Sequence, residues 1–285
     1  MIRILVDSAS DLTNDPEVYF VPLQVSINNH DYHDGVDIDR DTFYNLLINT
    51  PEFPKTSQPS PQDFLDIFNK VKNDNDELIC ILLSSSLSGT YQSAMLAKNI
   101  VDYDKIYLVD SLSASYAIKI LKDKAVKMIN ENHSAKEIVE ELESLKSRIK
   151  IIVSVDTLDY LCKGGRLSAT SAAIGNFAKL KPIITVSTEG KVKVAAKRIG
   201  INKTIEYLVD TVCNSDLDAS YPSYVLYTYG QNNVNKLIEK LNDNHFKVAD
   251  CLQIGSTIGS HVGPEAFGII YVVAEIIVVL KRALF

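Results

Sequence analysis

Three short apolar runs in the first half of the chain each end in small polar residues, and this repeat constrains the fold more than any other feature. The runs cover residues 2–6, 78–83 and 106–109. Short runs that are apolar at successive positions are typical of strands covered on both faces. The residues that follow them, such as Asp7-Ser8 and Asp110-Ser111, mark turns. The chain must therefore place helices on both sides of a sheet.

Helical periodicity fills the segments between these runs. Apolar residues recur at three- and four-residue spacing over 118–128 and 138–149. Ser134, followed three residues later by Glu137, is a capping-box signal for the second of these helices. A further strand is expected over 151–155. Strands that alternate with helices predict a parallel, helix-covered sheet.

The second half of the chain has a different pattern. Gly164-Gly165 indicates a helix end, and strands over 183–187 and 192–195 flank a hairpin turn. Further helices are expected over 169–180, 201–212 and 234–241, and a strand over 224–229. An apolar stretch over 267–280 predicts a buried final strand with a further apolar segment, and a membrane-associating tail is the weaker alternative. We predict two α/β domains, an N-terminal parallel sheet in 1–155 and a mixed C-terminal domain in 156–285.

Charge and cysteine content exclude several classes of protein. The net charge is −7, which argues against a nucleic-acid-binding protein, because binding to the phosphate backbone depends on clustered Lys and Arg. Cys80, Cys162, Cys213 and Cys251 are far apart and form no CxxC pair, so neither structural zinc nor a disulfide framework is predicted. The chain opens directly on a strand-like run without a signal peptide, and no segment of spanning length is expected, so we predict a cytoplasmic protein.

The serine-rich turn at 84–90 is the most informative local feature. In an open parallel sheet, ligands lie beyond the carboxyl ends of the strands, and a helix that begins near Thr90 would direct its free amides there. Ser88 and Gly89 would let an anionic head group approach the backbone. The alternative, that the serines only cap the helix, is about equally favoured by spacing alone.

Other polar segments carry weaker signals. The Pro-containing segment 55–61 is expected as a surface or cleft loop, and Arg166 beside two glycines suits a carboxylate or equally a structural Asp. His261, in a glycine-spaced loop, donates a hydrogen bond, acts as a base or only fills a turn. His30 and His33 are expected on a solvated hairpin edge rather than at a metal.

Enzyme signatures are sparse. Neither GxxxxGK[ST] nor GxGxxG follows a strand, so neither common phosphate loop is present. Ser88 and His261 would be the nucleophile and base of a serine-dependent esterase, the main alternative function, but there is no GxSxG elbow.

Seven segments, in order along nearly the whole chain, together resemble the DegV family of bacterial lipid-binding proteins. They are Val6-Asp7-Ser8 with Asp11-Leu12, Asp34-Gly35-Val36-Asp37-Ile38, Thr56-Ser57-Gln58-Pro59-Ser60, Ser85-Ser86-Leu87-Ser88-Gly89-Thr90-Tyr91, Val109-Asp110-Ser111, Gly164-Gly165-Arg166-Leu167-Ser168 and Ile258-Gly259-Ser260-His261-Val262-Gly263-Pro264. Ser260 and Glu265 depart from the family pattern, which usually has threonine and glycine there.

The resemblance implies two α/β domains with a long-chain fatty acid in a tunnel between them. It implies that Thr56 and Ser88 hold the carboxylate, with amides near Gly89, and that His261 and Arg166 support this network or its exposed surface. It also implies that the protein is a carrier without cofactor or metal, not an enzyme, and that it presents the fatty acid to a separate kinase that forms the acyl-phosphate.

Overall fold

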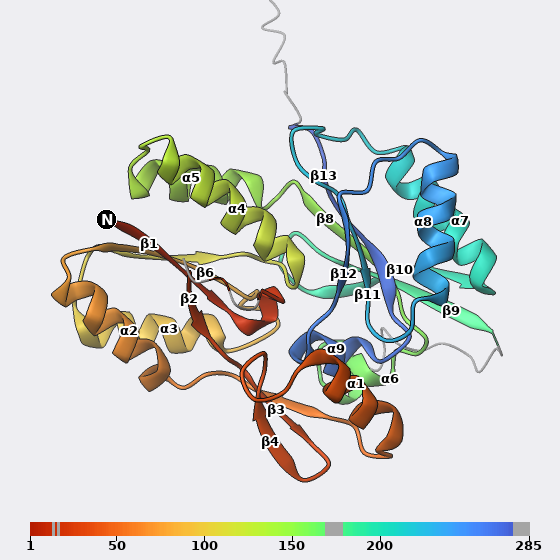
Figure 1. Ribbon diagram of the computed structural model, residues 1–285, viewed down its shortest axis with the longest axis horizontal. Coiled ribbons are helices and arrows are strands. Elements are labelled where there is room, and N and C mark those ends of the chain that lie inside the picture. The colour runs from red at the N-terminus through yellow and green to blue at the C-terminus, as the bar shows by residue number, and fades with distance from the viewer. Residues whose placement is uncertain (13–14, 16–17, 169–178, 276–285) are drawn as a thin grey trace, which may run out of the picture.

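The computed structural model describes residues 1–12, 15, 18–168 and 179–275, and it contains a parallel and a mixed sheet side by side (Figure 1). The first sheet has the order β2-β1-β6-β7, and every neighbouring pair is parallel. These strands are β1 (Ile2–Asp7), β2 (Val18–Val21), β6 (Glu77–Leu82) and β7 (Ile106–Asp110). This arrangement confirms the predicted N-terminal parallel sheet.

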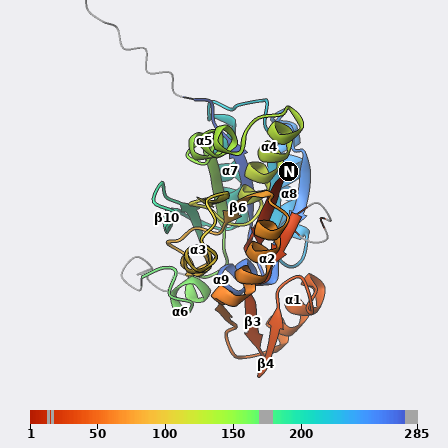
Figure 2. The ribbon, with the colours of Figure 1, turned by 90° about the vertical axis from the view of Figure 1, so that its left-hand side faces the viewer.

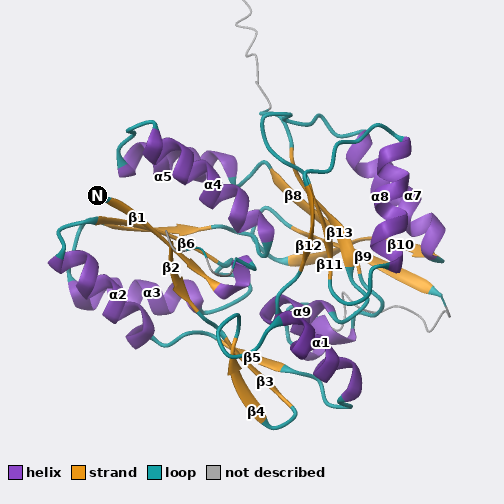
Figure 3. Ribbon diagram, viewed as in Figure 1, coloured by secondary structure: helices purple, strands orange, loops and turns teal. Residues whose placement is uncertain are grey.

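Helices cover both faces of the parallel sheet, as Figure 3 shows. On one face, α4 (Tyr116–Asn130) and α5 (Ala135–Leu145) pack against Ile4 and Val6. On the other face, α2 (Pro61–Asn73) and α3 (Thr90–Val101) pack against Leu5. Successive side chains of a strand point to opposite faces, so an apolar run without alternation is what this double cover requires.

The second sheet has six strands in the order β10-β9-β8-β13-β11-β12. They are β8 (Ile149–Ser154), β9 (Leu180–Val186), β10 (Val192–Ile199), β11 (Tyr224–Tyr227), β12 (Asp250–Gln253) and β13 (Phe267–Val272). Among the described strands of this sheet, only β11 and β12 are parallel neighbours, so the sheet is mixed, as predicted. The helices α7 (Ile201–Cys213) and α8 (Asn232–Asp243) cover one face, and the other face is turned toward the parallel sheet.

The strand β8 corrects one sequence-based interpretation. The sequence placed it with the N-terminal parallel sheet, but it pairs antiparallel with β9 and β13 in the six-stranded sheet. A strand's neighbours are fixed by contacts from distant segments, which its own apolar pattern does not contain. If the chain is divided by the sheet to which each strand belongs, the division falls before Ile149, whereas the predicted domain boundary follows Val155.

A small antiparallel sheet extends below the two larger ones in both views (Figures 1 and 2). Its order is β4-β3-β5, with β3 (Gln24–Ile27), β4 (His30–His33) and β5 (Lys55–Ser57), and α1 (Arg40–Asn49) packs on it. Asn28 and Asn29, both with positive φ, form the tight turn of the β3–β4 hairpin. His30 and His33 lie on this exposed hairpin, as predicted.

Two segments near the second sheet differ from expectation. The loop expected around His261 contains a short helix, α9 (Ser256–Val262), and the Pro-containing segment 55–61 supplies the edge strand β5. The helix expected over 169–180 falls mainly on residues 169–178, outside the described ranges, and Leu180 already begins β9. The expected final strand is β13, and the apolar residues 276–285 also lie outside the described ranges.

No helix in the described part of the chain is long and apolar enough to cross a bilayer.

Candidate functional site

A cavity lies between the two large sheets, and its empty space together with the open solvent at its mouth measures about 790 Å³. Its walls are mostly apolar and come from both halves of the molecule. The wall residues are Leu23, Leu83, Leu87, Ala114, Ile151, Val153, Leu161, Ile184, Val186, Val192, Leu226, Ile254, Ile258 and Val262. We call this space the central cavity.

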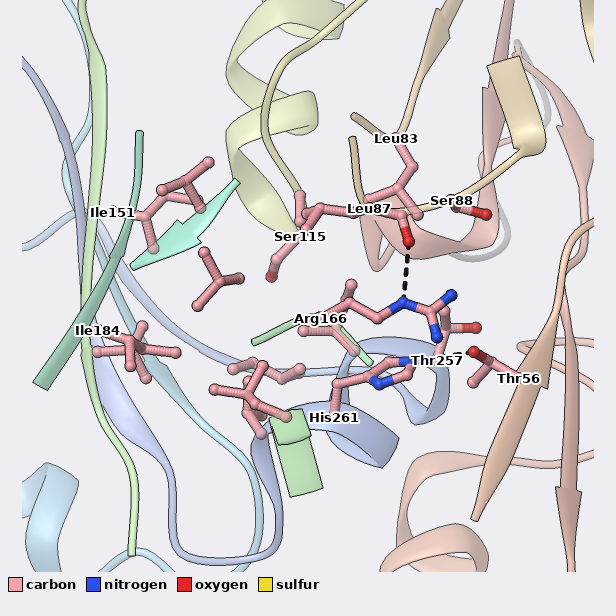
Figure 4. Close-up of a pocket in the computed structure, with 18 of the residues that line it drawn as sticks. Thr56, Leu83, Leu87, Ser88, Ser115, Ile151, Arg166, Ile184, Thr257 and His261 are labelled. Carbon is pink, nitrogen blue, oxygen red and sulfur yellow. Dashed lines mark hydrogen bonds between the residues drawn. The ribbon is translucent and has the colours of Figure 1, made fainter. Parts of the chain in front are cut away.

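Polar side chains gather at one end of the central cavity. Thr56, Ser88, Arg166 and His261 all line it, although they come from four separate segments (Figure 4). Ile151 and Ile184 lie on the opposite side of the same view. The cavity therefore has a polar end, the head end, and an apolar remainder.

A hydrogen bond between the small sheet and α9 forms part of the head end. The Oγ1 atom of Thr56 lies 2.8 Å from Nε2 of His261. Burial, with a smaller contribution from the nearby Arg166 guanidinium, lowers the pKa of His261 to about 4. The imidazole is therefore neutral at physiological pH and can act as a hydrogen-bond partner, but it is a weak base.

Arg166 owes its position to the end of a short helix, α6 (Asp159–Lys163). The amides of Gly165 and Arg166 donate to the carbonyls of Cys162 and Leu161, at 3.0 and 2.9 Å. This is a Schellman motif, and Gly165 takes its left-handed position with φ of +74°. The motif explains why Gly165 precedes the arginine and why the Arg166 side chain leaves the helix toward the cavity, whereas Gly164 packs against His261.

The Arg166 guanidinium joins the two halves of the molecule. Its Nε donates to the carbonyl of Leu87 at 2.9 Å, and a terminal nitrogen donates to the carbonyl of Gly164 at 2.5 Å. In Figure 4 the side chain lies beside Thr56 and His261. Arg166 thus brings a positive charge to the head end while holding the serine-rich turn in place.

The serine-rich turn uses most of its hydroxyls for structure. Ser84 and Ser86 donate to the backbone carbonyls of Gly190 and Glu189, at 2.9 and 2.7 Å, and so attach the turn to the β9–β10 hairpin. The Oγ of Ser88 lies 2.9 Å from Oγ1 of Thr90, the first residue of α3. Of these three serines, Ser88 is the one that lines the cavity.

Gly89 is close to the head end but is not among the residues that line the cavity. A Cβ atom at this position would lie 1.7 Å from the side-chain oxygen of Gln58. The amide nitrogen of the same Gln58 side chain, Nε2, donates to Ser93 Oγ at 3.1 Å. Gly89 therefore packs closely against the end of the Gln58 side chain, between α3 and the segment after β5.

Two buried carboxylates hold α9, the helix that carries His261. Asp34 accepts from the amides of Ser256 and Thr257 at 3.3 and 3.2 Å, and Asp11 accepts from the amide of Gly255 at 2.9 Å. Burial raises the pKa of Asp11 to about 7. These distant caps explain why a glycine-spaced segment is helical, and they could not be seen in the local sequence.

Thr257 is a cavity residue that sequence reasoning missed. Its Oγ1 is buried and has no hydrogen-bond partner in the described structure, and the residue lines the same cavity as His261. Unpaired buried hydroxyls are costly, so a polar ligand atom would stabilise this group. The only signal available in the sequence was its place in the segment that contains His261.

The two positions that depart from the family pattern lie away from the cavity lining. Ser260 is buried, and its Oγ donates to the carbonyl of Ser256 at 2.8 Å within α9. Glu265 is exposed and lines a separate surface hollow. Neither places a charge in the head end.

No cluster of three or more His, Cys, Asp or Glu side chains suited to a metal occurs among the described residues. His33 instead approaches Asp37, with 2.9 Å between Nδ1 and Oδ2, and His30 approaches the carbonyl of Asn28. The four cysteines are free thiols.

The sequence and the fold match known proteins over nearly their whole length. A protein of Caldanaerobacter subterraneus subsp. tengcongensis, DegV domain-containing protein TTE1491, is 36% identical and aligns with 95% of this chain and 98% of its own. A DegV family protein from Thermus thermophilus, described for its fatty acid binding, has a TM-score of 0.85 at 29% identity, with 95% and 99% of the two chains covered. A stearic acid-binding protein from Eubacterium ventriosum has a TM-score of 0.86 at 28% identity, with 95% and 98% covered. The pattern of the uncharacterised proteins of the DegV family matches residues 1–274, and this chain therefore belongs to the DegV family.

Proposed function

We propose that the protein binds a long-chain fatty acid in the central cavity and carries it to a partner enzyme. The observation that carries this proposal is a mostly apolar cavity that ends in a cluster of polar side chains and one guanidinium. Each buried methylene contributes about 0.8 kcal/mol, so a long tail supplies most of the affinity. The fatty acids bound by the relatives from Thermus thermophilus and Eubacterium ventriosum support the same ligand class.

In this proposal the carboxylate lies at the head end, because a carboxylate without donors in a dry cavity is costly. Arg166 provides the opposite charge, and Thr56 and Ser88 provide hydroxyls. Neutral His261 orients Thr56 through their 2.8 Å hydrogen bond. The unpaired Oγ1 of Thr257 adds a further donor that the sequence did not suggest.

We infer that the protein acts as a carrier rather than as a serine esterase. A nucleophile–base pair needs a Ser88–His261 hydrogen bond, but in the described structure Ser88 is bonded to Thr90 and His261 to Thr56. No carboxylate of the described residues orients the buried Nδ1 of His261, and the pKa of about 4 makes the imidazole a poor base.

We further propose that the partner is a separate fatty acid kinase, which phosphorylates the carboxylate in the cytoplasm. Arg166 and Ser88 are half-buried, so the head end is within reach of a docked enzyme. Four free cysteines fit a reducing compartment. The test adds the loaded protein to a purified fatty acid kinase with ATP. We expect stoichiometric acyl-phosphate, and no product above a lipid-free control would contradict the partnership.

The ligand itself can be tested by mass spectrometry of an organic-solvent extract from the purified protein. We expect one fatty acid per chain, and the stripped protein should take up added fatty acid. A protein that is repeatedly empty and takes up no lipid would overturn the proposal.

Two substitutions test the head end. Thr56→Val removes the hydroxyl with little change of shape, and Ser88→Ala removes the other, so each should weaken fatty acid binding by roughly tenfold. Ser86→Ala is the matched control, because its hydroxyl bonds to Glu189 and does not line the cavity. Unchanged affinity in either test variant would remove that residue from the site.

A further inference from the structure

A second, polar pocket adjoins the central cavity at the side away from the head end. Ile151, Thr185 and Val186 line both spaces. We call the second space the lysine pocket. Its remaining lining residues are Leu112, Ser113, Lys146, Ser147, Ile149, Lys150, Ser187, Thr188 and Lys193.

The strand β8 connects the two spaces. Alternate residues of a strand point to the same face, and Ile149, Ile151 and Val153 are such a series. Ile149 lines the lysine pocket, Val153 lines the central cavity and Ile151 lines both. An acyl chain that follows this face of β8 away from the head end therefore reaches the part of the lysine pocket lined by Ile149.

Lys150 alternates with this series of β8 residues. Lys193 alternates with Val192 and Val194, which pack in the same hydrophobic cluster as Ile151. The two lysines therefore line the pocket from the opposite face of the sheet.

The six-stranded sheet opens at this point. In the described structure β8 pairs with β9 only from Ile152 to Ser154, so the two strands diverge before Ile152. The hydroxyl of Thr185 donates to the carbonyl of Ile151 at 2.6 Å and satisfies one backbone group at the opening. The lysine pocket therefore lies where β8 and β9 diverge, at the side of the central cavity away from the head end.

The charge of the lysine pocket is not balanced. None of the described residues that line it is acidic. Lys146 is neutralised by Glu143, 2.6 Å away, but the ammonium of Lys150 bonds only to the carbonyl of Ser147, and no ion pair of Lys193 occurs in the described part of the chain. Burial, and then the charge of Lys193, lower the pKa of Lys150, so the two ammonium groups repel each other. A bound oxyanion would remove this repulsion.

We propose that the lysine pocket binds a carboxylate at the far end of the acyl chain, held by Lys150 and Lys193, so that the protein accepts dicarboxylic fatty acids. The proposal rests on the proposed function, because the same chain must occupy the central cavity. A cavity closed by apolar side chains would reject such a ligand, since the second carboxylate would be buried without a partner.

The test compares binding of monocarboxylic and α,ω-dicarboxylic fatty acids of equal length by calorimetry, over a series of chain lengths. We expect the diacid to bind at least as tightly as the monoacid once the chain is long enough to span the cavity. In the double variant Lys150→Gln, Lys193→Gln, the diacid should lose roughly tenfold in affinity while the monoacid is unchanged. Lys197→Gln, an exposed lysine of β10 outside the pocket lining, should change neither.

Each outcome is decisive. Monoacid binding with weaker diacid binding at every length, or a diacid affinity that the lysine variants do not change, overturns this inference alone. Absence of monoacid binding overturns the proposed function as well. Inorganic phosphate is titrated in parallel, and a pocket that binds phosphate but shows no preference for the diacid takes a free anion, which also contradicts the proposal.

Discussion

The head end and the apolar wall of the central cavity are built in different ways. Six of the fourteen apolar wall residues lie on strands β8, β9, β10 and β11 of the six-stranded sheet, where side chains repeat with a period of two. The head end combines an edge strand, a turn, a helix terminus and a short helix, represented by Thr56, Ser88, Arg166 and His261.

This difference separates two kinds of control over a bound ligand. The wall sets how much apolar chain is buried, and its effect should depend on chain length. The head end sets how well one carboxylate is satisfied, and its effect should be the same for every chain length. Substitutions at each end can therefore be distinguished by the chain lengths that they affect.

The largest expected effect concerns the buried imidazole at the head end. Below pH 6.5 the unfolded chain protonates His261, whereas in the folded protein its pKa is about 4. The contribution of His261 to stability is therefore complete above pH 6.5 and is lost as the pH falls toward 4. Between pH 7 and 4.5 the wild type should lose up to about 3 kcal/mol more unfolding free energy than His261→Gln.

Urea unfolding of both proteins at the two pH values measures this difference, in which the contributions of other groups cancel. His133→Gln, at an imidazole that is 41% exposed, is the control and should follow the wild type. If the unfolding free energies of the wild type and His261→Gln change equally with pH, burial does not lower the pKa of this imidazole.

The next effect tests the wall. Ala114 lines the cavity, and Ala114→Phe should displace several methylenes of a long tail, a loss on the order of a hundredfold in affinity. Fatty acids short enough to leave this part of the cavity empty should bind as before. Equal losses at all chain lengths in a fluorescence displacement assay would mean that the wall does not act through tail volume.

A smaller effect is expected at a contact between α6 and α9. A Cβ atom on Gly164 would lie 2.3 Å from Nδ1 of His261, although the φ of −72° suits any residue. Gly164→Ala should displace the imidazole from Thr56 and weaken binding of all chain lengths by roughly tenfold.

Gly165→Ala is the matched control for this contact. Its φ is +74°, but no atom of the described residues lies within 4 Å of the added Cβ. It should lower the unfolding free energy by about 1 kcal/mol and leave affinity unchanged. If both variants bind equally well, the Gly164–His261 contact is not needed at the head end.

The smallest effect is expected for Arg166→Lys. A lysine keeps the charge but cannot reproduce the fork that reaches both Leu87 and Gly164. Fatty acid affinity should fall a few-fold, independently of chain length, in the same displacement assay. A loss of affinity that increases with the length of the fatty acid would mean that Arg166 contacts the tail rather than the carboxylate.

The same contrast explains what the sequence revealed. Strand runs predicted β6, β7 and β11, because burial on both faces leaves a local apolar pattern. The family segments brought Thr56, Ser88, Arg166 and His261 forward, and all four line one cavity.

What the sequence did not reveal depends on distant contacts. The sheet membership of β8 is decided by β9 and β13, and the helix α9 by caps from Asp11 and Asp34. Thr257 was missed for the same reason, because its place in the cavity lining follows from α9. The partners of these residues are separated from them by tens to hundreds of positions in the chain.

The capping of α9 has a consequence for biosynthesis. Asp11 and Gly255 are 244 positions apart, so the segment that carries His261 gains its shape only after the last part of the chain meets the first. A ribosome-bound or truncated chain without the residue 255–262 segment would lack a complete binding site for the carboxylate. We therefore expect lipid binding only after the two ends of the fold have come together.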